Sequence, residues 1–435
     1  MKFWSKRALK RITIALGLLV GMALVANGIL AWRAQYRLDA IVAKIQAAGE
    51  PASIADLTPK PISAETNAAV HLQSMSLDLD AFAKDHKKFY QTPLGEELDK
   101  RSENMPGVGW ARPNAEQLTA IRIIVDAHAS ILRALQQAAQ CEEYASLLNF
   151  SPPPSQFLER VMKDCTRPRQ LARYVVWKMA TLVADGKSDE AIQLGVQMLR
   201  LIRLWDHEPL LINYLVGVAI RGMMFDSINT ALRQNQHSTQ MLHALDAELA
   251  LQDSPTPLAQ ALCTERAFAI SYVQEQTGVL SAFVRWPMLS YFVGELDAEN
   301  EACNVAKFPL NQVHLQWDPT NKVSAPKELI DLKSNLIGPA IVSAFSAQFR
   351  YVTKARCLRV LNALEEYYQR TGKEADSIEQ LSLPLEATID PYVNKPLRLK
   401  KTDLGWIVYS VGIKGIDNGG KLDVQENEGV APPDY

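Results

Sequence analysis

The sequence lacks the short motifs that mark most enzymes. Its 435 residues contain no glycine-rich phosphate-binding loop, no G-x-S-x-G turn and no H-E-x-x-H zinc motif. Its seven histidines are scattered, and His237 and His243 lie six residues apart, the wrong spacing for one helix face. The sequence therefore assigns no catalytic, cofactor-binding or metal-binding residue.

Cysteine is scarce, and none of the five cysteines belongs to a C-x-x-C pair, so zinc and thioredoxin-like sites have no support. An exported chain can nevertheless form disulfides. The plausible pairs are Cys141 with Cys165 and Cys263 with Cys303, which would leave Cys357 free. Small buried thiols in helices are the equally good alternative.

Acidic residues are absent from the first 33 positions, where an uncharged run extends from Ile12 to Trp32. Since a helix rises 1.5 Å per residue, this run covers about 31 Å, the thickness of a bilayer's hydrocarbon core. Basic residues before the run predict a cytoplasmic N-terminus and an exported remainder, periplasmic in a Gram-negative cell. These residues are Lys2, Lys6, Arg7, Lys10 and Arg11.

The competing interpretation is a cleavable signal peptide, whose apolar core would be shorter and would end at a small-x-small site. The run is too long for that, and the stretch from Ala23 to Ala26 is a poor cleavage site inside it. We therefore expect a retained signal anchor that crosses the bacterial inner membrane once. Gly17 and Gly21 form a G-x-x-x-G pair, which would allow the span to dimerise, although glycine is common in spans.

Basic blocks are missing from the rest of the chain. Without its first 33 residues the chain has 40 Lys and Arg against 48 Asp and Glu. Such an acidic surface cannot neutralise phosphates, so nucleic-acid binding is disfavoured. The expected partners are the membrane and envelope proteins, or a second copy through the transmembrane helix.

Apolar residues recur mostly at helical spacing, which predicts a mainly α fold. The anchor helix should continue to Gly49, and residues 89–113 look like a loop rich in Pro and Gly. A helical hairpin should surround Asp185-Gly186, and the helix opened by Pro209 is apolar nearly all round. This last helix should be a buried core helix and no second span, because Asn213 and Arg221 interrupt it.

The end of the chain changes period. The stretch 300–326 is irregular, a long helix is expected over roughly 339–370, and two alternating strands follow around Leu397 and Trp406. We therefore divide the chain into five segments. They are a basic cytoplasmic segment (1–11), the transmembrane anchor (12–32), an irregular multi-helix extracytoplasmic domain (33–336), a long helix with a β-hairpin (337–424) and a flexible tail (425–435).

The closing segments "EEYYQRTGK", "DPYVNKPLRLKK" and "GWIVYSVGIKGIDNGG" resemble the globular end of type II secretion pseudopilins. The resemblance implies a helix-plus-hairpin module and, in that family, a calcium-binding last loop. Lys414 stands where an acid would be expected, with only Asp417 and Asp423 nearby. The pseudopilin processing site is absent, so the chain is no pseudopilin subunit itself.

Most of the chain, including "ETNAAVHL" and "DHEPLLINYLVGVAIRG", is similar to a group of bacterial membrane-anchored helical proteins. This resemblance implies a fold and a location but no chemistry.

Three residue sets could still carry function. Asp206 and His207, with Arg203 one turn earlier, could transfer protons, but a capping and ion-pair cluster is the better interpretation. Ser324 and Lys327 match S-x-x-K without its companion motifs. Arg169, Arg173 and Trp177 form one helix stripe, which could grip an acidic ligand but is more often a packing face.

The sequence thus favours a membrane-anchored envelope protein with a non-enzymatic interaction or scaffold role. The alternatives are a hydrolase-like enzyme with an unrecognised helical site around Asp206, and a secretion or pilus accessory protein.

Overall fold

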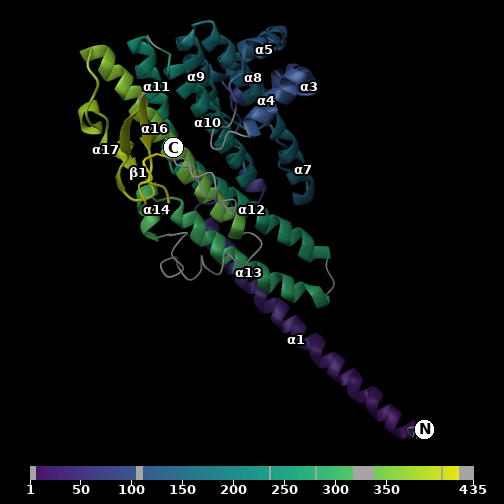
Figure 1. Cartoon of the computed structure of the whole chain (residues 1–435). Helices are drawn as coiled ribbons and strands as arrows, with labels where there is room; N and C mark the ends of the chain where they lie inside the picture. The colour runs from purple at the N-terminus through teal and green to yellow at the C-terminus, as the bar shows by residue number, and fades with distance from the viewer. Residues whose placement is uncertain are drawn as a thin grey trace, which may run out of the picture.

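A computed structural model of the chain describes residues 6–103, 111–234, 237–279, 282–316, 338–402 and 405–420. Helices dominate, as the sequence predicts (Figure 1). The long helices are α1 (Lys6–Ala47), α8 (Thr166–Ala184), α9 (Ser188–Trp205), α10 (Leu211–Leu232), α12 (Thr256–Val279), α13 (Ala282–Val305) and α16 (Gly338–Thr371). Shorter helices are α2 (Ala68–Ser74), α3 (Ser76–Phe89), α4 (Pro93–Glu103), α5 (Ala115–Ala127), α6 (Ser130–Gln140), α7 (Pro154–Asp164), α11 (Thr239–Gln252), α14 (Leu310–Gln316) and α17 (Leu385–Thr388). Two 3-10 turns are η1 (Ala55–Leu57) and η2 (Ile378–Leu381).

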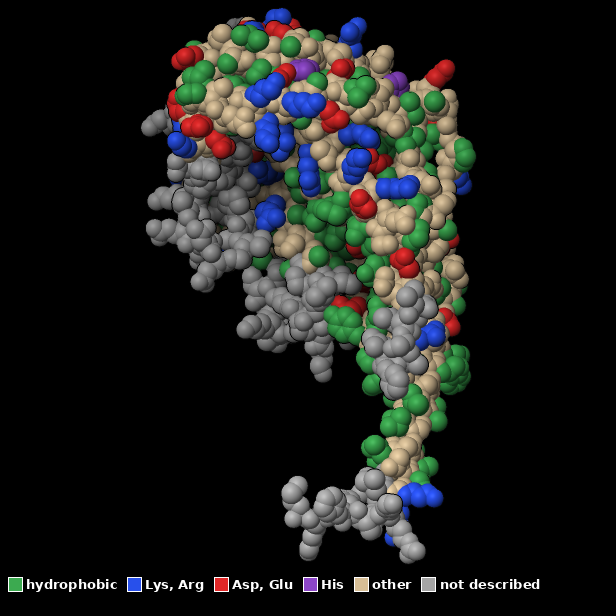
Figure 2. All heavy atoms as spheres, turned by 90° about the vertical axis from the view of Figure 1, so that its right-hand side faces the viewer, with side chains coloured by type: hydrophobic (Ala, Val, Ile, Leu, Met, Phe, Trp, Pro, Cys, Tyr) green, Lys and Arg blue, Asp and Glu red, His purple; other side chains and the backbone are tan. Residues whose placement is uncertain are grey.

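Helix α1 is a rod that leaves the body of the molecule (Figure 1). Its outer half exposes apolar side chains such as Ile14, Val25 and Trp32. Figure 2 shows hydrophobic side chains, in green, along the rod. This half is long and apolar enough to cross a membrane. The rod ends where Gly49 adopts φ +73°, a left-handed conformation that suits glycine at a helix end.

The inner half of α1 packs on the α12–α13 hairpin. Ala34, Leu38 and Ile45 are buried there. They meet buried residues of the hairpin, namely Ile270, Val273, Leu289, Phe292, Val293 and Leu296. One continuous helix therefore carries both the exposed apolar rod and part of a packed core.

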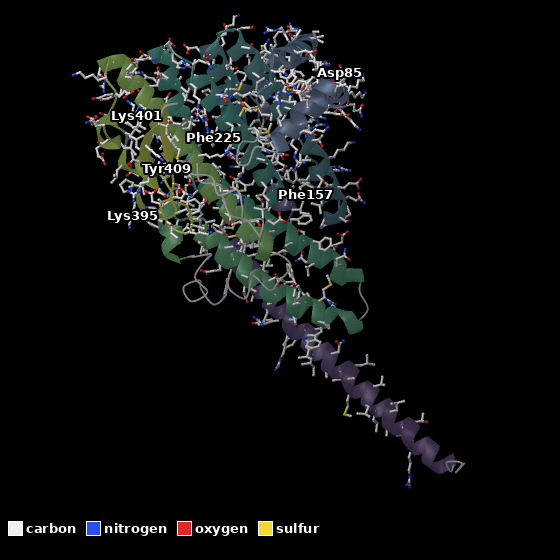
Figure 3. All side chains as sticks on the ribbon, in the orientation of Figure 1. Asp85, Phe157, Phe225, Lys395, Lys401 and Tyr409 are labelled. Atoms are coloured by element: carbon white, nitrogen blue, oxygen red, sulfur yellow. The ribbon has the colours of Figure 1, made fainter. Side chains whose placement is uncertain are left out.

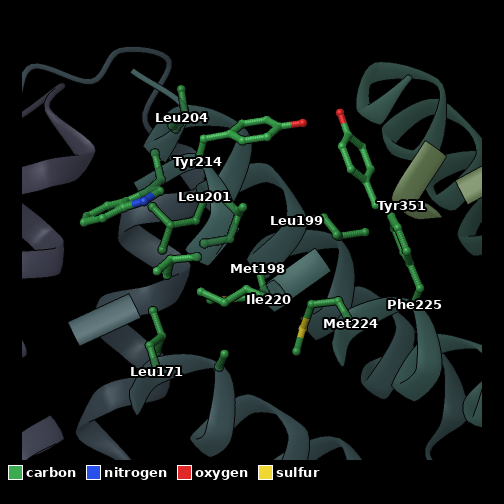
Figure 4. Packing of buried hydrophobic residues seen from close by; sticks show 14 of the residues in the cluster. Leu171, Met198, Leu199, Leu201, Leu204, Tyr214, Ile220, Met224, Phe225 and Tyr351 are labelled. Atoms are coloured by element: carbon green, nitrogen blue, oxygen red, sulfur yellow. The ribbon is translucent and has the colours of Figure 1, made fainter. Parts of the chain in front are cut away.

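Helix α10 lies at the centre of the main core, as its all-round apolar sequence predicts. It packs against α8, α9, α12 and α16. Figure 4 shows Ile220, Met224 and Phe225 of α10 among leucines of α9 and Tyr351 of α16. Asn213 and Arg221 are buried with polar partners, so this helix, although apolar enough to span a membrane, is a core helix with 56% of its most apolar window buried.

The closing module contains two small antiparallel sheets. Strand β1 (Ile389–Asp390) pairs with β2 (Lys395–Pro396), and β3 (Arg398–Thr402) pairs with β4 (Gly405–Tyr409). The second pair is the predicted hairpin, with Leu399 opposite Val408. The C-terminal half of α16 covers it through Val360 and Leu364, whereas the N-terminal half of α16 belongs to the main core.

Two expected irregular stretches are partly helical. The loop predicted for 89–113 contains α4. The N–H of Gly95 donates to Oγ1 of Thr92 at 3.3 Å, and Pro93 occupies the first helical position, where proline's missing N–H costs nothing. The stretch predicted irregular from Asn300 contains the end of α13 and all of α14. Here tertiary packing favours helix, since Ala302, Cys303 and Val313 are buried. This packing outweighs the weak helix propensity of the asparagines in the stretch. Residues 317–326 lie outside the described residues.

Gly195 tests the close contact of α8, α9 and α10. A Cβ atom on Gly195 would lie 2.7 Å from Cγ1 of Ile228 and 3.2 Å from Cε of Met179. We expect Gly195→Ala to lower the free energy of unfolding by about 1–3 kcal/mol, because the core must shift to admit the methyl group. The measurement is denaturant unfolding of the full chain in detergent, followed by circular dichroism.

Gly222 in α10 is the matched control, since no heavy atom lies within 4 Å of its added Cβ. Gly222→Ala should raise the free energy of unfolding by about 0.5–1 kcal/mol through helix propensity alone. Equal effects of the two substitutions would contradict the described packing.

Candidate functional site

The three side chains of the proposed proton-transfer group have different environments. Asp206 is buried and pairs with Arg221, whereas Arg203 donates to Glu248, with 3.2 Å between Nε and Oε1. His207 is exposed. Within the described residues no hydrogen bond or ion pair joins the three to one another, so their proximity in sequence does not build a catalytic group.

His207 lines an open cleft of about 630 Å³ beside the inner end of α1. The walls come from the α1–η1 connection, the segment after α6, the α9–α10 connection and α12. Their residues are Gln46, Gly49, Glu50, Pro51, Asp56, Leu57, Pro59, Tyr144, Ser146, Phe150, His207, Pro209, Gln260, Cys263 and Thr264. The cleft thus brings together polar groups that are far apart in the sequence.

Glu50 fixes the end of α1 to the α12–α13 hairpin at this cleft. Its Oε2 accepts from Nη2 of Arg266 at 2.6 Å, and its Oε1 accepts from Nζ of Lys307 at 2.5 Å. Burial alone would raise the pKa of Glu50, but the bonds from Lys307 and Arg266 hold it below its ordinary value. The carboxylate is therefore charged and held in place.

Glu208 lies behind the cleft wall and is buried. The Tyr144 hydroxyl donates to its Oε1 at 2.6 Å, and the Ser146 hydroxyl donates to its Oε2 at 2.7 Å. Burial raises the pKa of Glu208 to about 7 despite these bonds. A carboxyl group that titrates near neutrality beside a cleft is typical of functional sites, although structural networks produce the same shift.

The backbone at Leu210 is strained. This buried residue adopts φ 74° and ψ 147°, a combination that is essentially restricted to glycine and costs a residue with a side chain about 1–3 kcal/mol. Two bonds from the start of α10 to α12 hold it. The N–H of Leu210 donates to Oγ1 of Thr264 at 2.9 Å, and the N–H of Leu211 donates to Oε2 of Glu265 at 2.9 Å.

The stripe of Arg169, Arg173 and Trp177 is divided between the surface and the core. Trp177 is buried and stacks on His86, with 4.4 Å between ring centroids. The two arginines are exposed. Burial and the nearby charge of Arg173 lower the pKa of His86 to about 4, so this histidine is a neutral core residue.

The remaining histidine and acid candidates have separate partners. His237 contacts Asp189 at 2.9 Å and His243 contacts Glu366 at 3.0 Å. Within the described ranges no group of three or more His, Cys, Asp and Glu is placed to hold a metal ion. In the glycine turn, Asp417 accepts from the hydroxyl of Tyr409 at 2.9 Å. Asp423, and the pair Ser324 and Lys327, lie outside the described residues.

All five cysteines are free and buried. Cys141 and Cys165 form no disulfide with each other. Their thiols lie beside different groups. The Cys165 thiol donates to Oδ1 of Asn213 at 2.8 Å, whereas Cys141 lies 3.6 Å from the carbonyl oxygen of Gln137. Cys263 and Cys303 lie opposite each other where α12 packs on α13, because Nη1 of Arg266 donates to Oδ1 of Asn300 at 2.8 Å one turn away on each helix.

A second and larger concavity, the groove, separates the helical domain from the closing module. It encloses about 980 Å³ between α8, α10, α16 and β4. Its apolar floor includes Trp177, Phe225, Leu358 and Trp406. Figure 3 shows Phe225 between the helices and the strand that carries Tyr409.

The groove is positively charged. Arg101, Arg112, Arg233 and Lys354 line it, against one acid, Asp226, among the described lining residues. Lys354 pairs with Asp226 at 3.2 Å. Arg112 and Arg233 are exposed, and neither has a side-chain partner in the part of the chain that the structure describes. Sequence reasoning missed the groove because its lining comes from five distant stretches.

Comparison of the chain with protein-family models, with curated proteins and with solved structures finds no match.

Glu299 of α13 generates a pH prediction. Its side chain is buried, and neither carboxyl oxygen has a partner among the described residues. Burial, reinforced by the charge of Glu265, raises the pKa of Glu299 to about 8. At pH values between 4.5, the ordinary pKa of the group, and 8, the folded state binds more protons than the unfolded state. The free energy of unfolding therefore falls as the pH rises from 4.5 to 8.

We therefore expect Glu299→Gln to raise the free energy of unfolding at pH 8 by about 2–4 kcal/mol and to leave it nearly unchanged at pH 5. Denaturant unfolding at the two pH values measures this difference. Glu142→Gln, at an exposed position, should have the same small effect at both. A Glu299→Gln effect independent of pH would contradict the raised pKa.

Proposed function

We propose that the protein is a single-span anchor of the bacterial inner membrane whose folded body is a non-enzymatic binding module in the periplasm. The support for the anchor is the division of α1. Its outer half exposes apolar side chains to no protein partner in the described structure, and its inner half packs on α12 and α13. A bilayer would cover the exposed half, and the basic residues before it favour a cytoplasmic N-terminus.

Removing the first 33 residues tests the anchor. The full chain should stay in the membrane pellet after carbonate extraction, whereas the chain lacking residues 1–33 should be released, because the apolar rod is gone. Protease added to spheroplasts should digest the body of the full-length protein. Release of the full chain by carbonate, or protection of the body, would contradict the proposed topology.

The groove supports the binding role. Its apolar floor excludes water from a ligand, and its two unpaired arginines attract negative charge. The ligand that fits both features is an acidic polypeptide segment with apolar side chains. We assign this segment to a partner protein of the envelope.

The edge of β4 gives such a segment a place to bind. Trp406, Ile407 and Val408 all line the groove, and three successive residues do so only where the strand presents its edge. Strand β4 pairs with β3 alone in the described structure. An extended peptide could therefore add to the free edge through main-chain hydrogen bonds, as in other sheet-edge recognition.

The cleft gives the enzyme alternative its one specific observation, since it holds His207 and Cys263 beside the buried Glu208. Nucleophilic catalysis requires a hydrogen bond between the nucleophile and its base. Within the described residues His207 forms none with Cys263 or Asp206. A role in secretion or pilus assembly depends only on the resemblance of the closing module and would be one case of partner binding in the groove.

Synthetic peptides test the groove. Three extended peptides with the same apolar residues and net charges of about −3, 0 and +3 are titrated at low salt against the full chain in detergent, with fluorescence polarisation as the readout. Because the groove carries excess positive charge, the acidic peptide should bind at least about tenfold more tightly than the basic one. Arg112→Glu combined with Arg233→Glu should reverse the order.

The matched control is Arg133→Glu with Arg160→Glu, which reverses two exposed charges outside the groove. This control should leave the order of affinities unchanged. Equal affinity of the three peptides, or an order that the groove reversal does not change, would contradict the proposed function.

A further inference from the structure

Two thiols lie beside each other where α12 packs on α13. Cys263 belongs to α12 and Cys303 to α13, and both are buried in the same core cluster. One turn after Cys263 and one turn before Cys303, Nη1 of Arg266 donates to Oδ1 of Asn300 at 2.8 Å, a register of the two helices that sets the thiols opposite each other. The partners of Cys141 and Cys165 are not cysteines. Cys357 is buried under the closing module, in a different core cluster. The molecule therefore has one described thiol pair.

The two thiols differ in their access to solvent. Cys263 lines the open cleft, whereas Cys303 does not line it and is completely buried. Arg266 follows Cys263 by one helical turn, and Lys307 lies beside it across Glu50. Arg266 and Lys307 carry two positive charges against the one negative charge of Glu50, and this balance favours a thiolate at Cys263. Proximity to Cys303 and these cations lower the pKa of Cys263, whereas the neighbouring thiol and burial raise the pKa of Cys303.

This asymmetry is what thiol–disulfide exchange requires, since a thiolate must attack from an accessible position and a second thiol must resolve the product. We propose that Cys263 and Cys303 form a reversible disulfide, and that Cys263 is the thiol that reacts with an external disulfide entering the cleft.

The exchange proceeds in two steps. The Cys263 thiolate attacks one sulfur of the external disulfide, whose S–S bond breaks, and the departing thiolate takes up the proton that Cys263 lost. Cys303 then loses its proton and attacks Sγ of Cys263, which breaks the mixed disulfide and releases the second external thiol. Two protein thiols are oxidised, and one external disulfide is reduced to two thiols.

The bond would join α12 to α13 next to the residues that hold the end of α1. Arg266 of α12 and Lys307, just after α13, both bind Glu50. Oxidation would therefore add a reversible covalent bond to the arrangement that fixes the folded body to its anchor helix. The proposal is independent of the groove, which lies on other elements.

Glutathione disulfide is the probe. The full chain in detergent is incubated with it, alkylated and analysed by peptide mass spectrometry. In the wild-type protein both Cys263 and Cys303 should escape alkylation after this incubation. Treatment with dithiothreitol before alkylation should make both thiols reactive again. The wild-type result needs no variant, so misfolding of a mutant cannot decide it.

Single substitutions identify the attacking thiol. Cys303→Ser should accumulate glutathione on Cys263, whereas Cys263→Ser should leave Cys303 at least about tenfold slower to react, because it is not exposed to the cleft. Cys141→Ser with Cys165→Ser is the control and should leave the bridge intact. Circular dichroism confirms that each variant is folded.

Three results would overturn the proposal. The first is alkylation of all five thiols after incubation with glutathione disulfide, and the second is a bridge through one of the other three cysteines. The third is a reaction of Cys303 with glutathione disulfide as fast as that of Cys263, when each is the only member of the pair.

Discussion

The arrangement of the core depends on one buried cation. Arg221 in the middle of α10 is 1% exposed. It pairs with Asp206 at the end of α9, donates to Oε1 of Gln252 at the end of α11 at 2.7 Å, and lies 5.4 Å from the ring centroid of Tyr351 on α16. One side chain thus fixes four helices. Gly217, one turn earlier on α10, leaves room for the side chain of Arg221, because a Cβ atom added to Gly217 would lie 3.0 Å from Nη1 of Arg221.

A buried ion pair is weak evidence for stability, because the cost of removing two charges from water can exceed their attraction. The charge of Asp206 nevertheless raises the pKa of Arg221 against the effect of burial, so the guanidinium is charged. An uncompensated charge at this depth costs about 3–5 kcal/mol. Any packing of α10 that separated Arg221 from Asp206 would carry that cost. A helix with apolar side chains alone could shift along its neighbours at a smaller cost. The pair therefore fixes the register of α10.

The elements that depend on local sequence patterns were predicted from the sequence. The rod of α1, the hairpin of α8 and α9, the buried α10 and the strands β3 and β4 follow from periodicity and from a few glycines and prolines. Arg221 was recognised as an interruption of the apolar helix, but its partners were not predicted, because only helix packing brings Asp206 and Gln252 to it. Helix α4 and the end of α13 were missed, because tertiary burial decides them against local turn signals. The groove was missed for the same reason, since it arises from contacts between distant helices, and the pKa values of Glu208 and Glu299 arise from burial. The pairing of Cys263 with Cys303 was one of the two that the sequence allowed, and the packing of α12 on α13 selects it.

The separation of the two sites has a physical consequence. Figure 1 shows the closing module at the end of the body away from the N-terminus of α1, and the groove lies against that module, whereas the cleft lies at the inner end of α1. Glu50, Arg266 and Lys307 hold the helix that leads to the bilayer, and the strained turn at Leu210 joins the same cleft to the start of α10. Helix α10 in turn supplies Phe225, Asp226 and Arg233 to the groove. Helix α10, whose register Arg221 fixes, therefore connects the turn beside the cleft to the wall of the groove. Coupling between two such sites requires an element with two arrangements, and the strained start of α10 is the described segment best placed to provide them.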